Sequence, residues 1–539
     1  MATTSSVPTS ADVTTHARNR TEVFAVHGAD PEVLAYAMAK YSRSALSMRQ
    51  SLREISSQRA EQFLNTFYFQ YGHRSIADLA HVAFAVERLS LLAAIVLVDE
   101  QRWDGQERST RYQNFLKSGW YLPDFGTEGA EPETARTLYT ETVESLFSAY
   151  ASVSAAVFEA LKIRVPCPEV LKQDAYERTL KARAFDVARY LLPLATNTSL
   201  GQIVNARTLE TQVSRLLSHS AAEVRDLGIK LRDAAIGPAW NLQGEAYEAL
   251  QARIAVVDPG LAVESDQLLT REVHAAPTLV KYAQPNAYEI QTRAELADAA
   301  VELLSSHPIA AAPAVDLVER TESLEVELAA TLIYSVSHHP YRQIRDLVAS
   351  LPEARVAEII ELGVRNRGRH DELLRAFHAG AALRFDILMD IGGFRDMHRH
   401  RRCTQIIQEF THLHGYDVPG AADLGEGTDI LAEAGVLDLY RDSIEAAYAA
   451  GRRIGQSGVP EAAQSALYVL PLATRIRSLF KMDFAEATYI SELRSAPAGH
   501  FSYRKVAWDM YLAVQRQHPA LAKYFRVTDF TEPIDILKR

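Results

Sequence analysis

The chain has 539 residues, of which 47% are apolar and 23% are charged, and this composition excludes a mostly disordered or collagen-like protein. Its 68 acidic residues outnumber its 57 basic ones, and the net charge of −11 argues against non-specific binding to a nucleic-acid backbone. Only two cysteines occur, Cys167 and Cys403, which excludes a zinc ribbon and a disulfide framework and fits a reducing, cytoplasmic location.

The N-terminal residues 1–20 are rich in Thr, Ser and Ala and contain no apolar core of a signal peptide, so we expect a flexible tail. The most apolar run, residues 89–98, has about half the length that a membrane-spanning helix needs. We therefore expect no membrane association.

In chain order, the hydropathy patterns predict strands and long helices. Residues 81–87 and 383–387 alternate between apolar and polar side chains and predict two strands, each followed by a helix, although a buried helix remains an alternative for both stretches. Residues 132–162 and 208–236 carry apolar residues at helical spacing and predict two helices, with Gly228 as the weak point of the second. The predicted fold class is α/β (α+β) and rich in helix, with a small sheet packed by helices in each of two repeated units.

An internal repeat is the basis for those two units. The pentapeptide LPLAT occurs at residues 192–196 and again at 470–474. Further pairs follow in the same order: 41–44 with 334–337, 49–50 with 342–343, 60–61 with 357–358 and 71–74 with 367–370. We predict a first copy at 21–258, a linker at 259–277 and a second copy at 278–539.

Cys167 lies between two prolines, and no histidine is near it in sequence. A buried structural thiol is therefore a better interpretation than a nucleophile. No P-loop, dinucleotide-binding glycine motif or metalloprotease motif occurs in the chain, and we expect no metal site.

Two polar stretches are the candidate sites. Residues 105–112 (GQERSTRY) combine hydroxyls, a carboxylate and guanidiniums that suit a phosphate and a polar base edge, although a solvated loop at a helix end has the same composition. Residues 398–402 (HRHRR) are five consecutive basic residues in an acidic protein. They indicate either the site of one small anion or an exposed basic patch.

At these residues the chain resembles the flavin-dependent thymidylate synthases, whose signature is Arg-His-Arg followed after a short gap by Asn-Glu-x-Ser-x-Arg-Tyr. The resemblance extends over most of the chain from about Tyr41, and each copy departs from the signature differently. The first copy keeps the Glu-x-Ser-x-Arg-Tyr part, with Gln106 in place of Asn, whereas its Arg-His-Arg positions are Asp99, Glu100 and Gln101. The second copy keeps Arg-His-Arg within 395–402, but its later signature positions are Ile407, Glu409 and Thr411.

The resemblance implies a role for each matching residue. The residues implied for nucleotide binding are Glu107, Ser109, Arg111 and Arg189. Those implied for flavin binding are Ser75, which follows the Gly-His stretch, Asn205, Arg207, Arg399, His400 and Arg401. Arg215 and Arg494 are rival candidates for the catalytic arginine beside the uracil ring, whereas Leu467 replaces the arginine that corresponds to Arg189.

The implied reaction methylates dUMP to dTMP, with methylenetetrahydrofolate as carbon donor, FAD as cofactor and NADPH or NADH as reductant. Because family sites are assembled from several subunits, two unlike copies can form one composite site, and a homodimer would correspond to a pseudo-tetramer. Two alternatives remain: a related flavoprotein that acts on another nucleotide, and a non-catalytic nucleotide-binding or scaffold protein. We expect no nucleic-acid partner.

Overall fold

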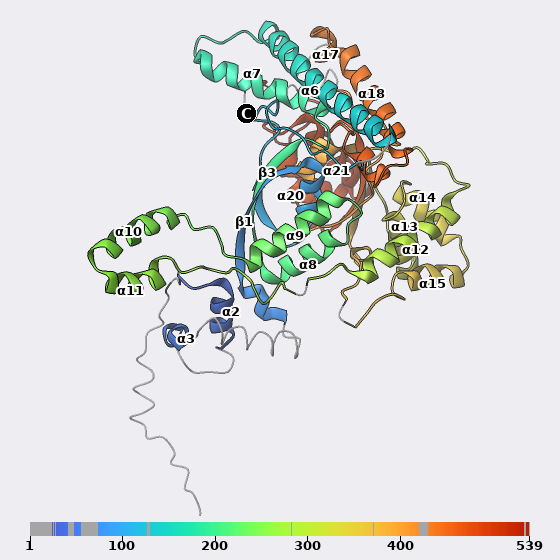
Figure 1. The fold of residues 1–539 in the computed structure, drawn as a ribbon. Coiled ribbons are helices and arrows are strands. Elements are labelled where there is room, and N and C mark those ends of the chain that lie inside the picture. The colour runs from blue at the N-terminus through green and yellow to red at the C-terminus, as the bar shows by residue number, and fades with distance from the viewer. Residues whose placement is uncertain are drawn as a thin grey trace, which may run out of the picture. The chain divides into compact units, whose positions relative to one another are not determined.

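The computed structural model describes residues 24, 26, 28–40, 48–54, 74–126, 130–281, 283–369, 371–419, 429–532 and 535–537. These residues belong to two compact units, one from residues 1–80 and 238–278 and the other from 81–237 and 279–539 (Figure 1). The predicted tail and the repeat segments 41–44, 60–61 and 71–73 lie outside the described residues.

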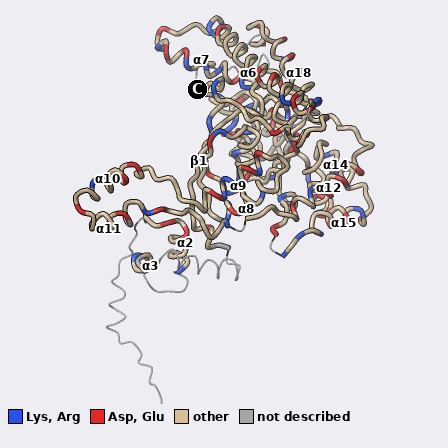
Figure 2. The backbone as a smooth tube through the Cα atoms, in the orientation of Figure 1, with Lys and Arg blue, Asp and Glu red and all other residues tan. Residues whose placement is uncertain are grey.

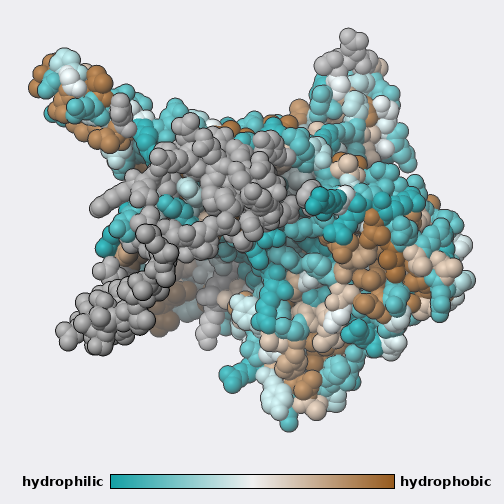
Figure 3. Space-filling model, turned by 90° about the horizontal axis from the view of Figure 1, so that it is seen from below, coloured by the Kyte–Doolittle hydropathy of each residue, from teal (hydrophilic) through white to brown (hydrophobic). Residues whose placement is uncertain are grey.

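The first unit is helical in its described part. Its elements are α2 (Pro31–Lys40), α3 (Met48–Glu54), the 3₁₀ helix η2 (Arg74–Leu79), α10 (Gly244–Val257) and α11 (Pro259–Leu269). Helices α10 and α11 pack as a hairpin. Their apolar residues Val256, Val257 and Leu268 are exposed, and brown surface marks the leftmost lobe in Figure 3.

Helix α11 occupies much of the stretch predicted as a linker. The Asp258 carboxylate accepts a hydrogen bond from the N–H of Leu261 at 3.0 Å, and Pro259 stands in the first turn. Proline fits the first turn because its missing N–H would have no partner there. Pro259, the first residue of the predicted linker, therefore begins a helix, while the boundaries of the two copies stay a prediction.

The second unit contains two antiparallel sheets that are built alike. The first sheet has the order β1-β3-β2, from β1 (His81–Ser90), β2 (Asp104–Glu107) and β3 (Asn197–Asn205). The second has the order β4-β5-β7-β6, from β4 (Val315–Leu317), β5 (Leu383–Asp390), β6 (Thr404–Ile407) and β7 (Arg475–Met482). The alternating stretches 81–87 and 383–387 are thus strands, as predicted.

Each central strand pair is flanked by helices at corresponding places. Strand β1 leads into α5 (Leu91–Leu97) and β3 into α8 (Ala206–Leu217), whereas β5 leads into α16 (Ile391–Met397) and β7 into α20 (Phe484–Ser495). Ser90 and Asp390 cap α5 and α16 by accepting N–H hydrogen bonds. The expected strand followed by a helix in each copy is confirmed.

The two copies pair directly along their LPLAT segments. The N–H of Leu194 donates to the carbonyl of Leu470, and the N–H of Leu472 donates to the carbonyl of Leu192, both at 2.9 Å. Pro193 and Pro471 face each other in an antiparallel bridge. Such a reciprocal exchange is the pattern of a two-fold interface between like subunits. The pentapeptides hence occupy equivalent places, as the duplication predicts.

Helices complete the second unit around the sheets. In the first copy they are α6 (Ala130–Arg164), α7 (Gln173–Ala188), η3 (Arg189–Leu191) and α9 (Ala222–Ile236). In the remainder of the chain they are α12 (Ala287–Leu304), α13 (Leu324–Tyr334), α14 (Tyr341–Ala349), α15 (Glu353–Leu362), η4 (Arg375–Phe377), α17 (Ile430–Glu433), α18 (Leu437–Gly455), α19 (Ala462–Leu467), α21 (Phe501–Gln517) and α22 (Pro519–Ala522). Acidic and basic residues are interspersed along the described backbone (Figure 2).

Helix α6 is the predicted helix 132–162, extended at both ends. Among the described residues it is the helix long and apolar enough, by length and composition, to cross a membrane, and our estimate from residues 89–98 overlooked it. Its buried residues, from Ala135 through Tyr150 to Leu161, recur at helical spacing, and it packs against α7 and α18. This pattern is typical of a helix that buries one face in a fold.

The predicted helix 208–236 is in fact two helices. The chain breaks at 218–221, between α8 and α9, and not at Gly228, which is buried inside α9. A Cβ at Gly228 would lie 3.1 Å from Cβ of Leu216 and 3.2 Å from N of Leu217. Gly228 therefore permits close packing of α9 on α8 and does not weaken the helix.

Candidate functional site

The basic run 398–402 follows α16 and leads into β6. His398 and His400 are buried, at 4% and 5% exposed, whereas the Arg402 side chain is 63% exposed and pairs with Asp483 at 2.6 Å. The alternative of an exposed basic patch thus describes Arg399 and Arg402, which are exposed, but not the two histidines.

The two separated parts of the signature meet within one chain. The Arg399 guanidinium donates to Oε1 of Gln106 at 2.9 Å, and Arg395, one turn earlier in α16, forms an ion pair with Glu107. Gln106 and Glu107 lie on β2 of the first copy, whereas Arg395 and Arg399 belong to the second. Residues of the two copies next to the split signature are therefore in contact.

A cavity of about 410 Å³ lies beside this junction. Three of its lining residues are predicted flavin ligands, Asn205 from the first copy and Arg399 and Arg401 from the second. The remaining lining residues are His81, Gln101, Arg102, Trp103, Asp104, Ile203 and Val204. The volume is in the range of small-molecule sites. Glu107, Ser109 and Arg111 are not among the lining residues, contrary to our expectation of one shared cleft.

Arg401 lies over the Trp103 ring, with its guanidinium carbon 4.4 Å from the ring centroid. Burial and the neighbouring Arg399 lower the pKa of Arg401 to about 10, so the side chain is still charged at neutral pH. Asn205 caps α8 by accepting from the N–H of Thr208 at 2.8 Å. A cation, a planar ring and an amide therefore face the same cavity.

Arg189 is buried, with its side chain 2% exposed. Its Nη1 is 3.7 Å from Asp396 and 3.5 Å from the Thr110 hydroxyl, and within the described part of the chain its Nε and Nη2 have no hydrogen-bond partner. Because an unsatisfied buried donor costs about 1–3 kcal/mol, such a guanidinium is suited to an anion.

Arg111, by contrast, is held by the protein itself. Its Nε donates to the Asp186 carboxylate at 2.8 Å, and its Nη1 donates to the Tyr503 hydroxyl at 2.8 Å. Burial acts to lower the pKa of Arg111, but Asp186 outweighs it and raises that pKa well above its ordinary value. Ser109 accepts from the backbone N–H of Arg111 at 3.2 Å.

Arg494 is the member of the rival pair that lies near these arginines. It donates to Nε2 of His400 at 2.8 Å, and its guanidinium carbon is 5.4 Å from the centroid of the Tyr503 ring. Burial, together with Arg494 and Arg401, lowers the pKa of His400 to about 3. The imidazole is therefore neutral and accepts without cancelling the charge of Arg494.

Arg215 lies at the corresponding place in the first copy, but its partner is acidic. Its Nη2 is 2.8 Å from the Glu100 carboxylate. Burial acts to lower the pKa of Arg215, but Glu100 and Asp99 raise it above its ordinary value. Burial raises the pKa of Glu100 while Arg215 acts to lower it, and the 2.8 Å contact pairs the guanidinium with a carboxyl group of the chain itself.

Arg207 and His400, two further predicted flavin ligands, are not among the cavity-lining residues. Arg207 is 3.4 Å from Glu372. Ser75 lies in η2 of the first unit, and its side chain is outside what the structure describes.

Sequence reasoning missed three residues of this region: Trp103, Asp186 and Tyr503. No motif contains Trp103 or Tyr503, and their neighbours come from the other copy. Asp186 could have been predicted, because it lies in an otherwise apolar stretch before Arg189. A carboxylate in such a stretch is seldom buried without a cation.

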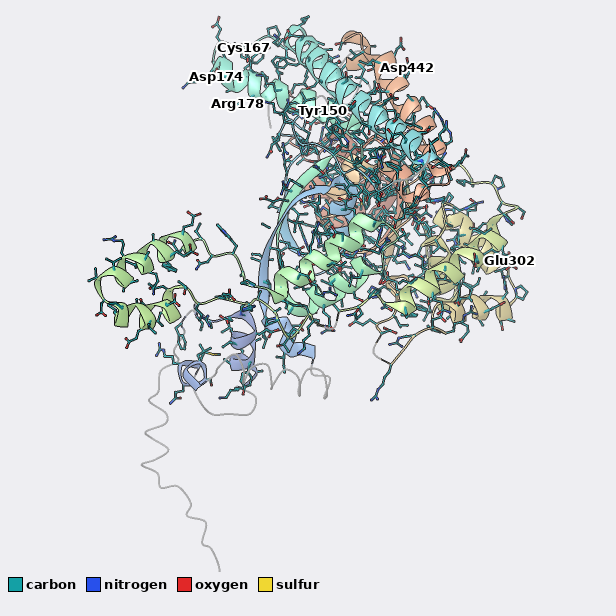
Figure 4. The ribbon with its side chains drawn as sticks, in the orientation of Figure 1. Tyr150, Cys167, Asp174, Arg178, Glu302 and Asp442 are labelled. Carbon is teal, nitrogen blue, oxygen red and sulfur yellow. The ribbon has the colours of Figure 1, made fainter. Side chains whose placement is uncertain are left out.

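Cys167, which we interpreted as a buried structural thiol, is exposed. It lies in the loop between α6 and α7, where Pro166 and Pro168 interrupt helical structure, and Figure 4 shows it at the outer end of that loop. Cys403 is buried, and burial raises the pKa of its thiol to about 12. Neither thiol takes part in the composite arrangement.

Comparison with known proteins gives a family. The family model described as thymidylate synthase complementing protein matches residues 24–236 and 316–520. A UPF0159 protein of Chlamydia muridarum (strain MoPn / Nigg) is 29% identical over 93% of this chain and 91% of its own length. A UPF0159 protein of Thermoplasma acidophilum is 25% identical over 91% of this chain and 94% of its own length. A flavin-dependent thymidylate synthase of Clostridium tetani (strain Massachusetts / E88) is 23% identical over 33% of this chain and 67% of its own length.

Proposed function

The chain belongs to the thymidylate synthase complementing protein family, and from that premise we propose that it is a flavin-dependent enzyme that methylates dUMP to dTMP. Methylenetetrahydrofolate supplies the carbon, and NADPH or NADH supplies the reducing equivalents. The observation that carries the proposal is the contact between the two copies at the split signature: Gln106 with Arg399, and Glu107 with Arg395, four residues before Arg399.

The cavity residues fit FAD. Arg399 and Arg401 offer guanidinium donors to a pyrophosphate, and the Trp103 ring supports the Arg401 guanidinium at the cavity wall. Nε of Arg401 has no hydrogen-bond partner among the described residues, so a donor is free for a ligand. When bound, the reduced flavin supplies the hydride of the reaction.

We assign the nucleotide phosphate to Arg189 and Ser109, because Arg189 has two free donors in a buried position. Arg111 donates to Asp186 and Tyr503. It is then a positioning residue that holds this side of the nucleotide site in place. We assign the uracil ring to Arg494, since no carboxylate among the described residues forms an ion pair with it. A cation beside O2 and N3 of the ring stabilises the negative charge that develops as carbon 5 becomes nucleophilic.

We further propose a cytoplasmic homodimer that corresponds to a pseudo-tetramer. The reciprocal LPLAT hydrogen bonds support this, because one chain already contains one two-fold interface between like copies.

The experiment is an absorbance assay on the purified chain. We expect a yellow protein whose flavin band is bleached by NADPH when dUMP is present, and dTMP formation when methylenetetrahydrofolate is added. Bleaching that responds to another nucleotide but not to dUMP would instead support a related flavoprotein, and a folded protein that binds neither ligand would support a scaffold.

A further inference from the structure

The local two-fold relation gives the signature junction a counterpart in the same unit. Residues 399–401 lie between α16 and β6, and residues 99–101 lie between α5 and β2. Arg399 and His400 of one place therefore correspond to Asp99 and Glu100 of the other, so that basic side chains are replaced by acidic ones.

Asp99 is bound by basic groups of the second copy. Its Oδ1 accepts from Nη1 of Arg375 at 2.5 Å and from Nε2 of His398 at 3.0 Å. The Asp99 carbonyl also accepts from Nη2 of Arg375 at 3.0 Å. Burial would raise the pKa of Asp99, but Arg375 and His398 hold it well below its usual range. The carboxylate is therefore a permanent anion among cations.

The signature junction and its counterpart differ most clearly at the arginines in the last turns of α8 and α20. Arg494 meets the neutral His400, whereas Arg215 meets the Glu100 carboxylate at 2.8 Å. Glu100 thus occupies the position from which an external anion would neutralise Arg215.

Two further cavity residues have counterparts of different character. Asn205 begins α8 and lines the cavity, whereas Asp483 at the start of α20 pairs with Arg402 at 2.6 Å. Ile203 lines the cavity from β3, whereas Lys481 on β7 is buried and donates to Glu327 at 3.1 Å. These cations at the counterpart are therefore already paired with carboxylates of the chain itself.

We infer that the chain has one composite site for flavin and nucleotide, and that Asp99 and Glu100 are internal anions that occupy its counterpart. Within the described part of the chain, a pyrophosphate or phosphate meets guanidiniums with free donors at the first place and the carboxyl groups of Asp99 and Glu100 at the second. Repulsion by those carboxylates and loss of the Arg375 and Arg215 ion pairs both oppose binding there. This inference rests on the proposed function.

The test is the binding stoichiometry of the full chain. The protein is saturated with FAD, freed of unbound FAD by gel filtration, and assayed for flavin by absorbance and for protein by amino-acid analysis. Calorimetry with dUMP then gives the number of nucleotide sites. We expect one FAD and one dUMP per chain.

A matched pair of variants identifies the place. Arg401→Gln should lower the FAD affinity at least about tenfold, as expected when a guanidinium that contacts a phosphate is removed. Arg375→Gln, checked for folding by circular dichroism, should leave one FAD per chain. Two FAD per chain, or loss of FAD in Arg375→Gln but not in Arg401→Gln, would overturn the inference. A folded chain that binds neither FAD nor dUMP would refute the proposed function, and the one-site count with it.

Discussion

Replacing Arg189 by Met tests whether this arginine binds a ligand or stabilises the fold. The variant keeps most of the apolar volume of the side chain and removes the guanidinium. Two donors of Arg189 have no partner among the described residues, and each unsatisfied donor costs about 1–3 kcal/mol. The contacts with Asp396 and Thr110, at 3.7 and 3.5 Å, stabilise the folded state by about 1.5–3 kcal/mol. The free energy of unfolding should therefore change by between about −1 and +4 kcal/mol, so that the variant is at most slightly destabilised.

Nucleotide binding should respond in the opposite way. Loss of a buried guanidinium from a phosphate typically costs about 2–5 kcal/mol, which is roughly thirty- to several-thousand-fold in affinity. Urea denaturation measures the stability, and calorimetry with dUMP measures the affinity.

The control is Arg111→Met, in which the fully buried Asp186 loses the cation 2.8 Å away and keeps Arg183 at 3.9 Å. Removing one partner of a buried ion pair costs about 3–5 kcal/mol, so this variant should be destabilised by an amount that approaches this range. If Arg189→Met is destabilised to the same extent and still binds dUMP as the native protein does, the assignment of Arg189 to the phosphate is wrong.

Three other predictions concern the cavity, the helix packing and pH. Arg401→Ala should give a folded but weakly yellow protein, because the cation over Trp103 is lost; flavin absorbance per chain checks it. Gly228→Ala should lower the free energy of unfolding by about 1–3 kcal/mol, because the added Cβ would lie 3.1 Å from Leu216; urea denaturation checks it, and an unchanged midpoint would contradict the packing argument. The pKa of His400 is lowered to about 3 in the folded chain, whereas its ordinary value is about 6.5. At a pH between these two values, the unfolded chain therefore binds a proton at His400 that the folded chain does not bind. Stability should therefore fall as the pH falls through that window, by about 2 kcal/mol from this residue between pH 7 and pH 5, and His400→Gln should remove that part of the dependence.

The duplication and the strands could be predicted because their signals are local. The LPLAT segments are identical in sequence and make the same hydrogen bonds in each copy. The alternation at 81–87 directly reflects one buried face of β1. The break between α8 and α9 was misplaced because the helix propensity of Gly228 says nothing of the neighbouring helix that it must accommodate.

The chemical state of the arginines could not be predicted in the same way. Motif positions identify Arg111, Arg189, Arg215 and Arg494 but not their counter-ions. The partner of Arg215 is 115 positions away in sequence, and the tyrosine that binds Arg111 is 392 positions away. Which guanidinium is neutralised and which is free depends on tertiary contacts alone.

The central claim is that residues of both copies bind one flavin, and its most direct test is FAD affinity, measured by flavin fluorescence, in two variants. Asn205→Asp changes the first copy and keeps a good cap for α8, but it brings a negative charge to the cavity. Arg401→Gln changes the second copy. We predict that each substitution alone weakens FAD binding at least about tenfold, the effect of losing or opposing one phosphate contact. Native FAD affinity in either folded variant would contradict a site composed of the two copies.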